Sequence, residues 1–542
     1  MTEFGIALDI GTSGFRAQAV DLSTEEVIST AITLRHPIPG SNVIDHVNFA
    51  IEAGEDECNR LIIETINNLI ERLRLPRSNY SRMAVCGNPF QLSLFQNIEI
   101  RDLAYAGQNK LKALGVTPPK RDGCIIEAGD LGLNIEPSAR VIIPPAVTHE
   151  IGADAMAMLW ETHAFSAIVP TVIIDYGTNA EMSLIKAGRI LTGSAAAGPA
   201  LEGQEIERGM LASSGAISDL EIEEGGWRNY VLDEEFNVVK GDLVDPDSGV
   251  VLEKGRAHGK AIGITGTGVI AAASLATDVG LARSPKILTK DGVLRFQDGI
   301  ELTSSDREEA GKAIGAIRAG YMTLAYEAGM SPNDIEVAYM SGASGTYVDA
   351  RKAQRIGLAP YSAREIHQVG NTSLAMAKDL VINEELFGIL KTFANTLRAS
   401  HCMFATSEAF RAIYTIELSH WCYGMPMSLY NEMLDMSNLS PIDTEMGGAI
   451  VHRDVIRDIP DLGRMGLSIL HDVGVRLSSD LPGCVHCLKC VKACPEDALE
   501  ISKDGESWKA IILSDLCNGT ACRRCEQACS EGVMKVKHFR YA

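Results

Sequence analysis

Hydrophobic residues in the first 456 positions alternate between short continuous runs and stripes that recur every three or four residues. Continuous apolar runs bounded by glycine predict strands, and the stripes predict amphipathic helices. On this basis we expect strands at residues 4–8, 15–21, 83–86 and 171–175, and helices at 51–75 and 152–162. This alternation predicts a mixed α/β fold in which helices cover the sheets.

One pattern occurs twice in this part of the chain. Residues 6–14 read Ile-Ala-Leu-Asp-Ile-Gly-Thr-Ser-Gly, and residues 172–180 read Val-Ile-Ile-Asp-Tyr-Gly-Thr-Asn-Ala. Each copy is an apolar strand that runs into an aspartate and a Gly-Thr turn, and a second strand follows each turn. The repeat predicts two lobes of similar fold that face a common ligand.

The two turns have the chemistry of a phosphate site. Glycine lets backbone N–H groups approach an anion closely, and an aspartate beside the turn can hold Mg²⁺ through water. A tight hairpin alone would explain one copy, whereas the repetition favours a clamp on a polyphosphate. The residues expected at the nucleotide are Gly11, Thr12, Ser13 and Gly14 in the first turn and Gly177, Thr178 and Asn179 in the second.

Four aspartates are candidates for orienting the water that attacks ATP. Asp9 and Asp175 are expected to contact Mg²⁺ and this water, because each stands beside one of the turns. Asp130 and Asp154 have the character of surface or capping residues.

A third glycine cluster follows a predicted strand at residues 337–341. Gly342, Ala343, Ser344 and Gly345 form a small-residue turn on which a flat adenine and its ribose can lie. A further glycine-rich run at 263–268 leads into a helix, and nucleotide contact and close helix packing explain it equally well. The order of the turns resembles the actin, sugar kinase and Hsp70 ATPase superfamily over about residues 1–455. That resemblance implies two ribonuclease-H-like lobes that close on Mg-ATP.

Eight of the thirteen cysteines fall within the final 59 residues, in two runs. The run Cys484-x2-Cys487-x2-Cys490-x3-Cys494-Pro has the spacing of bacterial two-cluster ferredoxins. The run Cys517-x4-Cys522-x2-Cys525-x3-Cys529 repeats it with two extra residues, where Asn518 and Gly519 can form the turn. The ferredoxin pattern assigns one [4Fe–4S] cluster to Cys484, Cys487, Cys490 and Cys529, and a second to Cys517, Cys522, Cys525 and Cys494.

Zinc and disulfides are the alternatives for these cysteines. Zinc usually takes well-separated cysteine pairs, and a cytosolic chain keeps its thiols reduced, so both are disfavoured. His486 lies inside the first run and is expected to be a neighbour of the cluster rather than a ligand. The other five cysteines have apolar neighbours and are expected to be structural: Cys58, Cys86, Cys124, Cys402 and Cys422.

Charge separates the end of the chain from the rest. The net charge is −22, but the final 59 residues carry nine Lys or Arg against eight Asp or Glu. Together with turn-rich composition near residue 457, this predicts ATPase lobe I at 1–167, lobe II at 168–456, a linker at 457–483 and a ferredoxin-like α+β domain at 484–542.

The acidic balance of the whole chain argues against nucleic acid or an anionic membrane as partner. With no signal peptide or spanning segment visible, we expect a cytoplasmic protein.

Three further motifs resemble the reductive activators of corrinoid proteins. They lie at 194–203, at 342–345 together with 355–360, and at 370–375; a helix end and turn would also explain 355–360. Two clusters at the C-terminus resemble, within that family, the activators of methylamine methyltransferase systems in methanogenic archaea. Because the first phosphate strand begins near residue 4, we expect no N-terminal [2Fe–2S] domain of the kind found in related bacterial activators.

The resemblance implies an ATP-hydrolysing oxidoreductase that reduces inactive Co(II) to Co(I). Its partners would be a corrinoid protein of a methylamine methyltransferase system and a low-potential electron donor. Typical ferredoxin clusters have reduction potentials of about −400 mV. Each ~59 mV by which the acceptor's potential lies below that of the cluster lowers the equilibrium constant for one-electron transfer tenfold. Reduction of Co(II) is harder still, so ATP must favour a different complex or cobalt coordination.

Two other functions are compatible with this domain combination. An activator of 2-hydroxyacyl-CoA dehydratases joins a similar ATPase to one cluster shared across a dimer, whereas eight cysteines here supply two clusters in one chain. A sugar or acid kinase with a fused ferredoxin module would phosphorylate a small molecule without any electron donor.

Overall fold

The computed structural model describes residues 3–541, except 41, 106–107, 150, 178, 203–204, 235, 399, 456, 495 and 506. The chain forms two compact units, each built from several segments. Unit 1 comprises Met1–Asp154, Ser373–Asn395 and Asp461–Ala542, and unit 2 comprises Ala155–Thr372 and Thr396–Pro460. The chain therefore passes between the units more than once, whereas the predicted boundaries at 167 and 456 give each lobe one continuous segment.

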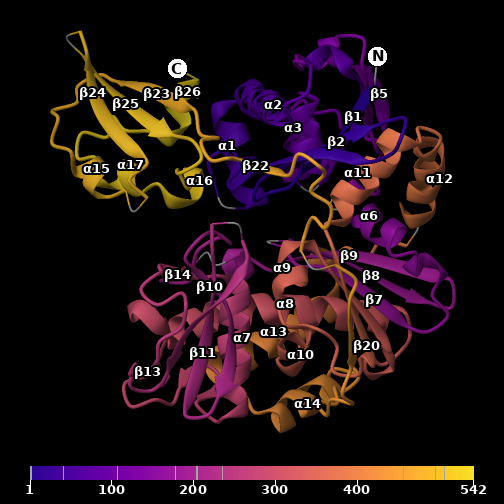
Figure 1. Cartoon of the computed structure of the whole chain (residues 1–542), viewed down its shortest axis with the longest axis vertical. Helices are drawn as coiled ribbons and strands as arrows, with labels where there is room; N and C mark the ends of the chain where they lie inside the picture. Colours follow the sequence, from indigo (N-terminus) through magenta and orange to yellow (C-terminus); the bar gives the residue numbers. More distant parts are fainter. Residues whose placement is uncertain are drawn as a thin grey trace. The chain divides into compact units, whose positions relative to one another are not determined.

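Unit 1 contains a seven-stranded sheet in the order β22-β3-β2-β1-β4-β6-β5. Its strands β1, β2, β5 and β22 are labelled in Figure 1. The first three strands along the chain are antiparallel neighbours, and β1 then pairs in parallel with β4. All seven residues of β1 are buried, as expected for a central strand covered on both faces. The strands are β1 (Phe4–Ile10), β2 (Phe15–Asp21), β3 (Val27–Thr33), β4 (Tyr80–Gly87), β5 (Cys124–Glu127), β6 (Arg140–Ile143) and β22 (Leu467–Leu470).

The single helix predicted at 51–75 is two helices. Helix α1 (Val43–Ala53) ends at Gly54, and α2 (Glu55–Arg72) begins directly after it. Gly54 has φ 116°, a conformation that a side chain would strain, so the helical stripe is interrupted there. The predicted apolar stripe is confirmed, because Leu61 and Leu69 of α2 are fully buried.

Unit 2 contains a six-stranded sheet in the order β21-β20-β19-β7-β8-β9, in which β9, β8, β7, β19 and β20 repeat the arrangement of β3, β2, β1, β4 and β6 in unit 1. Here too three antiparallel strands precede a parallel neighbour, since β7 pairs with β19 as β1 pairs with β4. The strands are β7 (Thr171–Asp175), β8 (Asn179–Lys186), β9 (Arg189–Ala196), β19 (Val337–Ser341), β20 (Glu365–Gly370) and β21 (Ile450–Arg453).

A second sheet in unit 2, with the order β13-β12-β11-β10-β14, had no counterpart among the predicted elements. Helix α7 (Gly266–Asp278) packs against its strand β10 (Ala216–Glu223). A Cβ atom on Gly266 would lie 1.9 Å from the Leu201 carbonyl oxygen, and one on Gly268 would lie 2.4 Å from the Ile217 carbonyl oxygen. The glycine-rich run at 263–268 therefore serves close helix packing. The other strands are β11 (Gly226–Leu232), β12 (Val238–Val244), β13 (Val251–Glu253) and β14 (Gly263–Ile264).

The C-terminal module, residues 476–541, has a four-stranded sheet in the order β24-β25-β23-β26. The segment expected as a linker contributes two strands: β22 joins the sheet of unit 1, and β23 joins the module. Proline and glycine made this segment look turn-rich, yet Leu477 and Leu481 of β23 are buried in the module. The module strands are β23 (Arg476–Leu481), β24 (Leu499–Asp504), β25 (Ser507–Leu513) and β26 (Arg540–Tyr541). Among the described residues, no helix has the length and apolar character needed to cross a membrane.

Candidate functional site

The first glycine turn joins β1 to β2 and holds a carboxylate beside a guanidinium. Asp9 is 5% exposed, and its Oδ2 lies 3.8 Å from Arg16 Nη1. The same guanidinium donates to the Gly14 carbonyl at 2.9 Å, and the Gly11 N–H closes the turn on that oxygen at 3.1 Å. A Cβ on Gly11 would lie 3.0 Å from the Gly14 carbonyl oxygen and 2.8 Å from Arg16 Nη1, so a side chain there would crowd the turn. The turn thus presents Asp9 in a fixed, buried position at the end of β1.

The second turn and the third glycine cluster lie together in unit 2. Asp175 ends β7 opposite Ser341 of β19, and a Cβ on Gly342 would lie 2.3 Å from Asp175 Oδ1. Gly342 also has φ 76°, so both space and backbone conformation require glycine. The sequence did not reveal that the carboxylate of Asp175 packs on this glycine.

The expected adenosine turn is a short helix, α9 (Gly342–Tyr347), so its residues lie on helical backbone rather than in an open turn. Ser344 Oγ donates to the Leu201 carbonyl at 3.4 Å, and Gly345 packs against Tyr176. Ala343 belongs to the same helix. In the second turn, Gly177 is in a bend, Asn179 opens β8 opposite Ala196, and Thr178 lies outside the described residues.

Asp154 lies closer to the first turn than its sequence context indicated. It is in the first turn of α6 (Ala153–Glu161), and its charge adds to that of Asp9 at the thiol of Cys86. Burial, followed by these two negative charges, raises the pKa of Cys86 well above its usual range. Cys86 pairs with Asp9 across β1 and β4. Asp154 is thus a third candidate carboxylate, whereas Asp130 is exposed in a short 3-10 turn.

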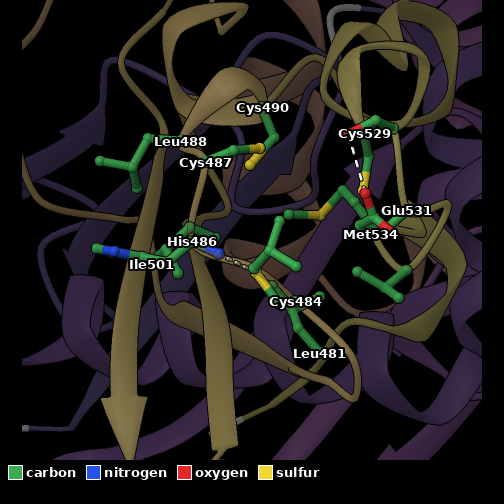
Figure 2. A pocket seen from close by; sticks show the side chains of 13 residues that line it. Leu481, Cys484, His486, Cys487, Leu488, Cys490, Ile501, Cys529, Glu531 and Met534 are labelled. Carbon is green, nitrogen blue, oxygen red and sulfur yellow. Dashed lines mark hydrogen bonds between the residues drawn. The ribbon is translucent and has the colours of Figure 1, made fainter.

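The C-terminal module gathers the eight clustered cysteines into two pockets. The first pocket is lined by Cys484, Cys487, Cys490 and Cys529, with apolar walls from Leu481, Ile501 and Met534 (Figure 2). The His486 N–H donates to Cys484 Sγ at 3.4 Å, while the His486 ring stacks on Trp508 with centroids 3.8 Å apart. The face of the His486 ring therefore packs on Trp508 beside the first pocket.

The second pocket is lined by Cys494, Cys517, Cys522 and Cys525. Burial raises the pKa of Cys517 to about 12 and that of Cys525 to about 11, and the Gly519 N–H, 3.3 Å from Cys517 Sγ, acts in the opposite direction on Cys517. The bare thiols of Cys517 and Cys525 stay protonated at neutral pH, so binding of iron there displaces protons. Each pocket offers four sulfur atoms in largely apolar surroundings, which fits a cubane iron–sulfur cluster.

The two extra residues of the second cysteine run lie where the module contacts the rest of unit 1. The Gly40 N–H donates to the Cys517 carbonyl at 2.9 Å, and Gly519, with φ 57°, lies against the Pro39 carbonyl. Arg523 pairs with Glu52 of α1, and the Tyr541 N–H donates to Glu57 Oε2 at 3.1 Å. The longer loop is thus a docking element as well as part of the second pocket.

A buried hydrogen-bond network connects this docking loop with the first turn. Asn88 donates to Thr12 Oγ1 at 3.3 Å and accepts from the Gln91 N–H at 2.9 Å. The Gln91 side chain bonds His36 Nε2 at 3.1 Å and His46 Nδ1 at 3.0 Å. His36 Nδ1 in turn accepts from the backbone N–H of Ile38, two residues before Gly40. A contiguous polar path therefore runs from the first turn to the second cysteine pocket within unit 1.

Both histidines of this network are neutral at physiological pH. Burial lowers the pKa of His46 from 6.5 to about 4 and that of His36 well below 6.5. Below about pH 6.5 the histidines of the unfolded chain bind protons that the folded histidines do not. The free energy of unfolding is therefore at its full value above that pH and decreases as the pH falls toward 4. For His46 this decrease amounts to about 3 kcal/mol.

We expect α1 to lose hydrogen-exchange protection by about thirtyfold between pH 7 and pH 5, after correction for intrinsic exchange. The measurement compares α1 with α8 (Ser304–Glu327) in the cluster-loaded protein. A His46→Asn variant removes the titrating imidazole and should show a smaller loss. Equal protection of α1 at both pH values would contradict this assignment.

Three family models match the chain. The first is the C-terminal domain of RACo, described as the ASKHA domain, over residues 169–431. The second is the RACo middle region over residues 4–164, and the third is a 4Fe-4S dicluster domain over residues 483–533. These matches confirm the predicted class, an ASKHA-type α/β ATPase fold with a C-terminal iron–sulfur domain.

Relatives of known identity agree with the family models. The chain is 50% identical over 507 residues to the Co(II) methylated amine-specific corrinoid protein reductase of Methanosarcina barkeri, covering 93% of each chain. It is 26% identical over 445 residues to the corrinoid activation enzyme RamQ of Eubacterium limosum, covering 76% of this chain and 69% of that one. The solved reductive activator for corrinoid, iron-sulfur protein matches with a TM-score of 0.62 at 24% identity, over 77% of this chain and 66% of that chain, and shows the fold alone.

The 50% identity extends over 93% of both chains. The chain therefore belongs to the family of reductive activators of corrinoid proteins.

Proposed function

We propose that this protein uses ATP to reduce the cobalt of a corrinoid protein from inactive Co(II) to Co(I), one electron at a time. The observation that carries the proposal is the C-terminal module, which gathers eight cysteines into two pockets. The module belongs to the same unit as the first glycine turn. One chain thus joins an electron carrier to an ATPase domain.

The residues of the module fit two [4Fe–4S] clusters. We assign Cys484, Cys487, Cys490 and Cys529 to the first cluster and Cys494, Cys517, Cys522 and Cys525 to the second. When bound, such clusters supply one-electron transfer at low potential. The N–H groups of His486 and Gly519 donate to a sulfur in each pocket, and such hydrogen bonds would raise the reduction potential of a bound cluster.

Mg-ATP is the nucleotide that the glycine turns suit. Gly11, Thr12, Ser13 and Gly14 would offer backbone and hydroxyl donors to phosphate. Gly177, Thr178 and Asn179 are proposed for the same role in the second turn, where Thr178 lies outside the described residues. Asp9 and Asp175 are the residues proposed to hold Mg²⁺ through water. Gly342, Ala343, Ser344 and Gly345 provide the small surface on which the adenosine lies.

The buried network gives a physical route by which nucleotide binding reaches the second cluster. A shift of Thr12 changes the hydrogen bonds of Asn88 and Gln91, and Gln91 holds the histidine that orients the segment before Gly40. We infer that ATP alters the docking of the cysteine loop through this network.

Gln91→Leu tests the coupling, because the variant loses both histidine contacts while its volume is nearly kept. We expect the change that Mg-ATP causes in the electron paramagnetic resonance spectrum of the reduced clusters to disappear, with ATP still bound. Gln18→Leu is the matched control, since Gln18 is also buried in unit 1 but bonds Thr30 and Asp461. Iron content and hydrogen exchange verify folding. A spectrum that still responds to ATP in Gln91→Leu would refute the route.

The partner is proposed to be a corrinoid protein of a methylamine methyltransferase system, supported by the relative from Methanosarcina barkeri. A low-potential donor would recharge the clusters. The cytoplasm is the proposed compartment, because cluster thiols must be kept reduced before iron binds.

ATP hydrolysis distinguishes this function from a kinase. We expect the hydrolysis rate to rise when a Co(II) corrinoid protein is added without oxygen, and to stay at its basal level with apoprotein that lacks the corrinoid. A phosphorylated sugar or acid formed in stoichiometric amounts from ATP would instead indicate a kinase with a fused electron carrier.

A further inference from the structure

A group of imidazole and carboxylate side chains stands on one face of β20 and β21 in unit 2. The two strands are parallel neighbours, and His367 pairs directly with His452. Glu365 lies two residues before His367 and therefore shares its face of the sheet. Side chains from adjacent strands thus bring two imidazoles and one carboxylate to one place.

The three side chains have the spacing of metal ligands. Glu365 Oε2 lies 3.7 Å from Nε2 of His367 and 3.7 Å from Nε2 of His452. The three ligand atoms all lie within 4.8 Å of one another. A point equidistant from atoms so separated lies roughly 2.1 to 2.4 Å from each, near the zinc–nitrogen distance of about 2.0–2.1 Å.

Two observations favour metal binding by the Nε2 atoms of His367 and His452. His452 Nε2 is buried and has no hydrogen-bond partner among the described residues, although its side chain is 40% exposed. His367 Nδ1 lies 3.2 Å from Asp454 Oδ2, and its ring stacks on Tyr339 with centroids 4.7 Å apart. A carboxylate at Nδ1 fixes the proton there and leaves the Nε2 lone pair for a metal, as it does for most metal-binding histidines.

We propose that Glu365, His367 and His452 bind one divalent transition-metal ion, with Zn²⁺ as the ion that this ligand set favours. The His367 and His452 rings stack 12° from parallel, with centroids 4.4 Å apart, so binding turns them toward each other. The partial exposure of His452 and Glu365 gives room for this movement and for water as the fourth ligand. The ion would tie the edge strand β21 to β20.

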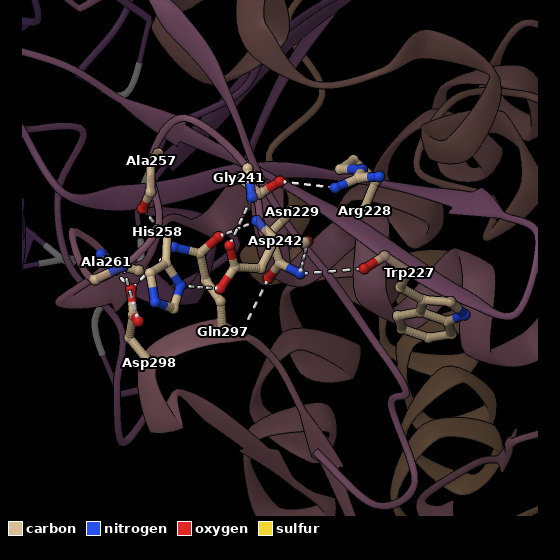
Figure 3. Close-up of polar contacts among 12 residues, drawn as sticks. Trp227, Arg228, Asn229, Gly241, Asp242, Ala257, His258, Ala261, Gln297 and Asp298 are labelled. Carbon is tan, nitrogen blue, oxygen red and sulfur yellow. Dashed lines mark hydrogen bonds and ion pairs between the residues drawn. The ribbon is translucent and has the colours of Figure 1, made fainter. Parts of the chain in front are cut away.

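A second group of similar composition serves as an internal contrast. Asp242, His258 and Asp298 also lie close together, but their oxygens are already used as hydrogen-bond acceptors (Figure 3). Asp242 accepts from the Gly255 N–H at 2.8 Å and lies 2.7 Å from His258 Nδ1. Asp298 accepts from the backbone N–H groups of Gly259 and Ala261. This group is a structural network that fixes a loop.

The test is equilibrium dialysis of the cluster-loaded chain against buffered Zn²⁺, followed by elemental analysis of zinc and iron. We expect one zinc per chain above the amount held by a His367→Ala, His452→Ala double variant, at unchanged iron content. Glu365→Gln should weaken zinc binding at least tenfold, and Asp454→Asn by about tenfold, the effect typical of a residue that orients a ligand. His258→Ala should retain the zinc of the wild type.

X-ray absorption at the zinc edge identifies the ligands. We expect nitrogen and oxygen scatterers near about 2.0 Å, whereas zinc in vacant cysteine pockets would show sulfur near about 2.3 Å. Equal zinc content in the wild type and the double variant, or a spectrum dominated by sulfur, would overturn the proposal. These readouts do not depend on reduction of cobalt, so they separate this site from the proposed activase function.

Discussion

Cys487→Ala is expected to reduce ATP-dependent formation of Co(I) to the level of a sample without the protein. Cys487 lines the first pocket with Cys484, Cys490 and Cys529, and its side chain is exposed at the pocket mouth. Three sulfur ligands hold a cubane poorly, and the fourth iron becomes open to solvent and oxidation. Without a complete cluster, the electron path to the partner is interrupted.

The measurement is cobalt absorption without oxygen, together with iron content and basal ATP hydrolysis. We expect iron to fall by about half while basal hydrolysis is retained, because the glycine turns lie outside the module. Cys422→Ala is the control, since Cys422 belongs to helix α13 (Glu408–Tyr423) and should keep both iron and Co(I) formation. Full Co(I) formation by Cys487→Ala would show that the first pocket is not needed for the reduction of cobalt.

Asp9→Asn is expected to lower ATP hydrolysis and ATP-dependent Co(I) formation by about a hundredfold, the scale of losing one charged group at a reacting phosphate. Asp9 is buried at the end of β1, beside Arg16 and the Gly11 turn. Asparagine keeps its shape but removes the charge that would hold Mg²⁺ and its water. The clusters should remain fully reducible by a chemical reductant.

Asp130→Asn is the matched control, because Asp130 is exposed and is expected to leave hydrolysis unchanged. Asp154→Asn adds information, since that carboxylate also influences Cys86 beside the turn. Hydrolysis within threefold of wild type in Asp9→Asn would exclude the carboxylate from the reaction. A large loss in Asp154→Asn alone would transfer the role to that residue.

Much of the fold could be predicted because it depends on local patterns. The β1 and β7 hairpins follow from apolar runs that end in Asp-x-Gly-Thr, and the cysteine spacing predicted an iron–sulfur module. The β10–β14 sheet and strand β23 were missed, since polar and charged residues interrupt their apolar runs, as in Ala216–Glu223 and Arg476–Leu481. Gly54 divides a continuous helical stripe through its backbone conformation, which the spacing of apolar residues does not report.

The remaining features of the site depend on contacts distant in sequence. Gly519 was expected to form a turn, but its position against Pro39 arises from residues far apart in the chain. The buried contacts of Gln91 with His36 and His46, and the packing of Asp175 on Gly342, are likewise set by tertiary structure. No spacing rule identifies such pairs in a single sequence.

The most direct test follows cobalt absorption in an anaerobic mixture of cluster-loaded protein, a low-potential reductant and a Co(II) corrinoid protein, with and without Mg-ATP. We expect Co(I) to form only when Mg-ATP is present. A non-hydrolysable analogue should not support repeated formation of Co(I). Equal Co(I) with and without Mg-ATP, or no Co(I) with any methylamine-system corrinoid protein, would contradict it.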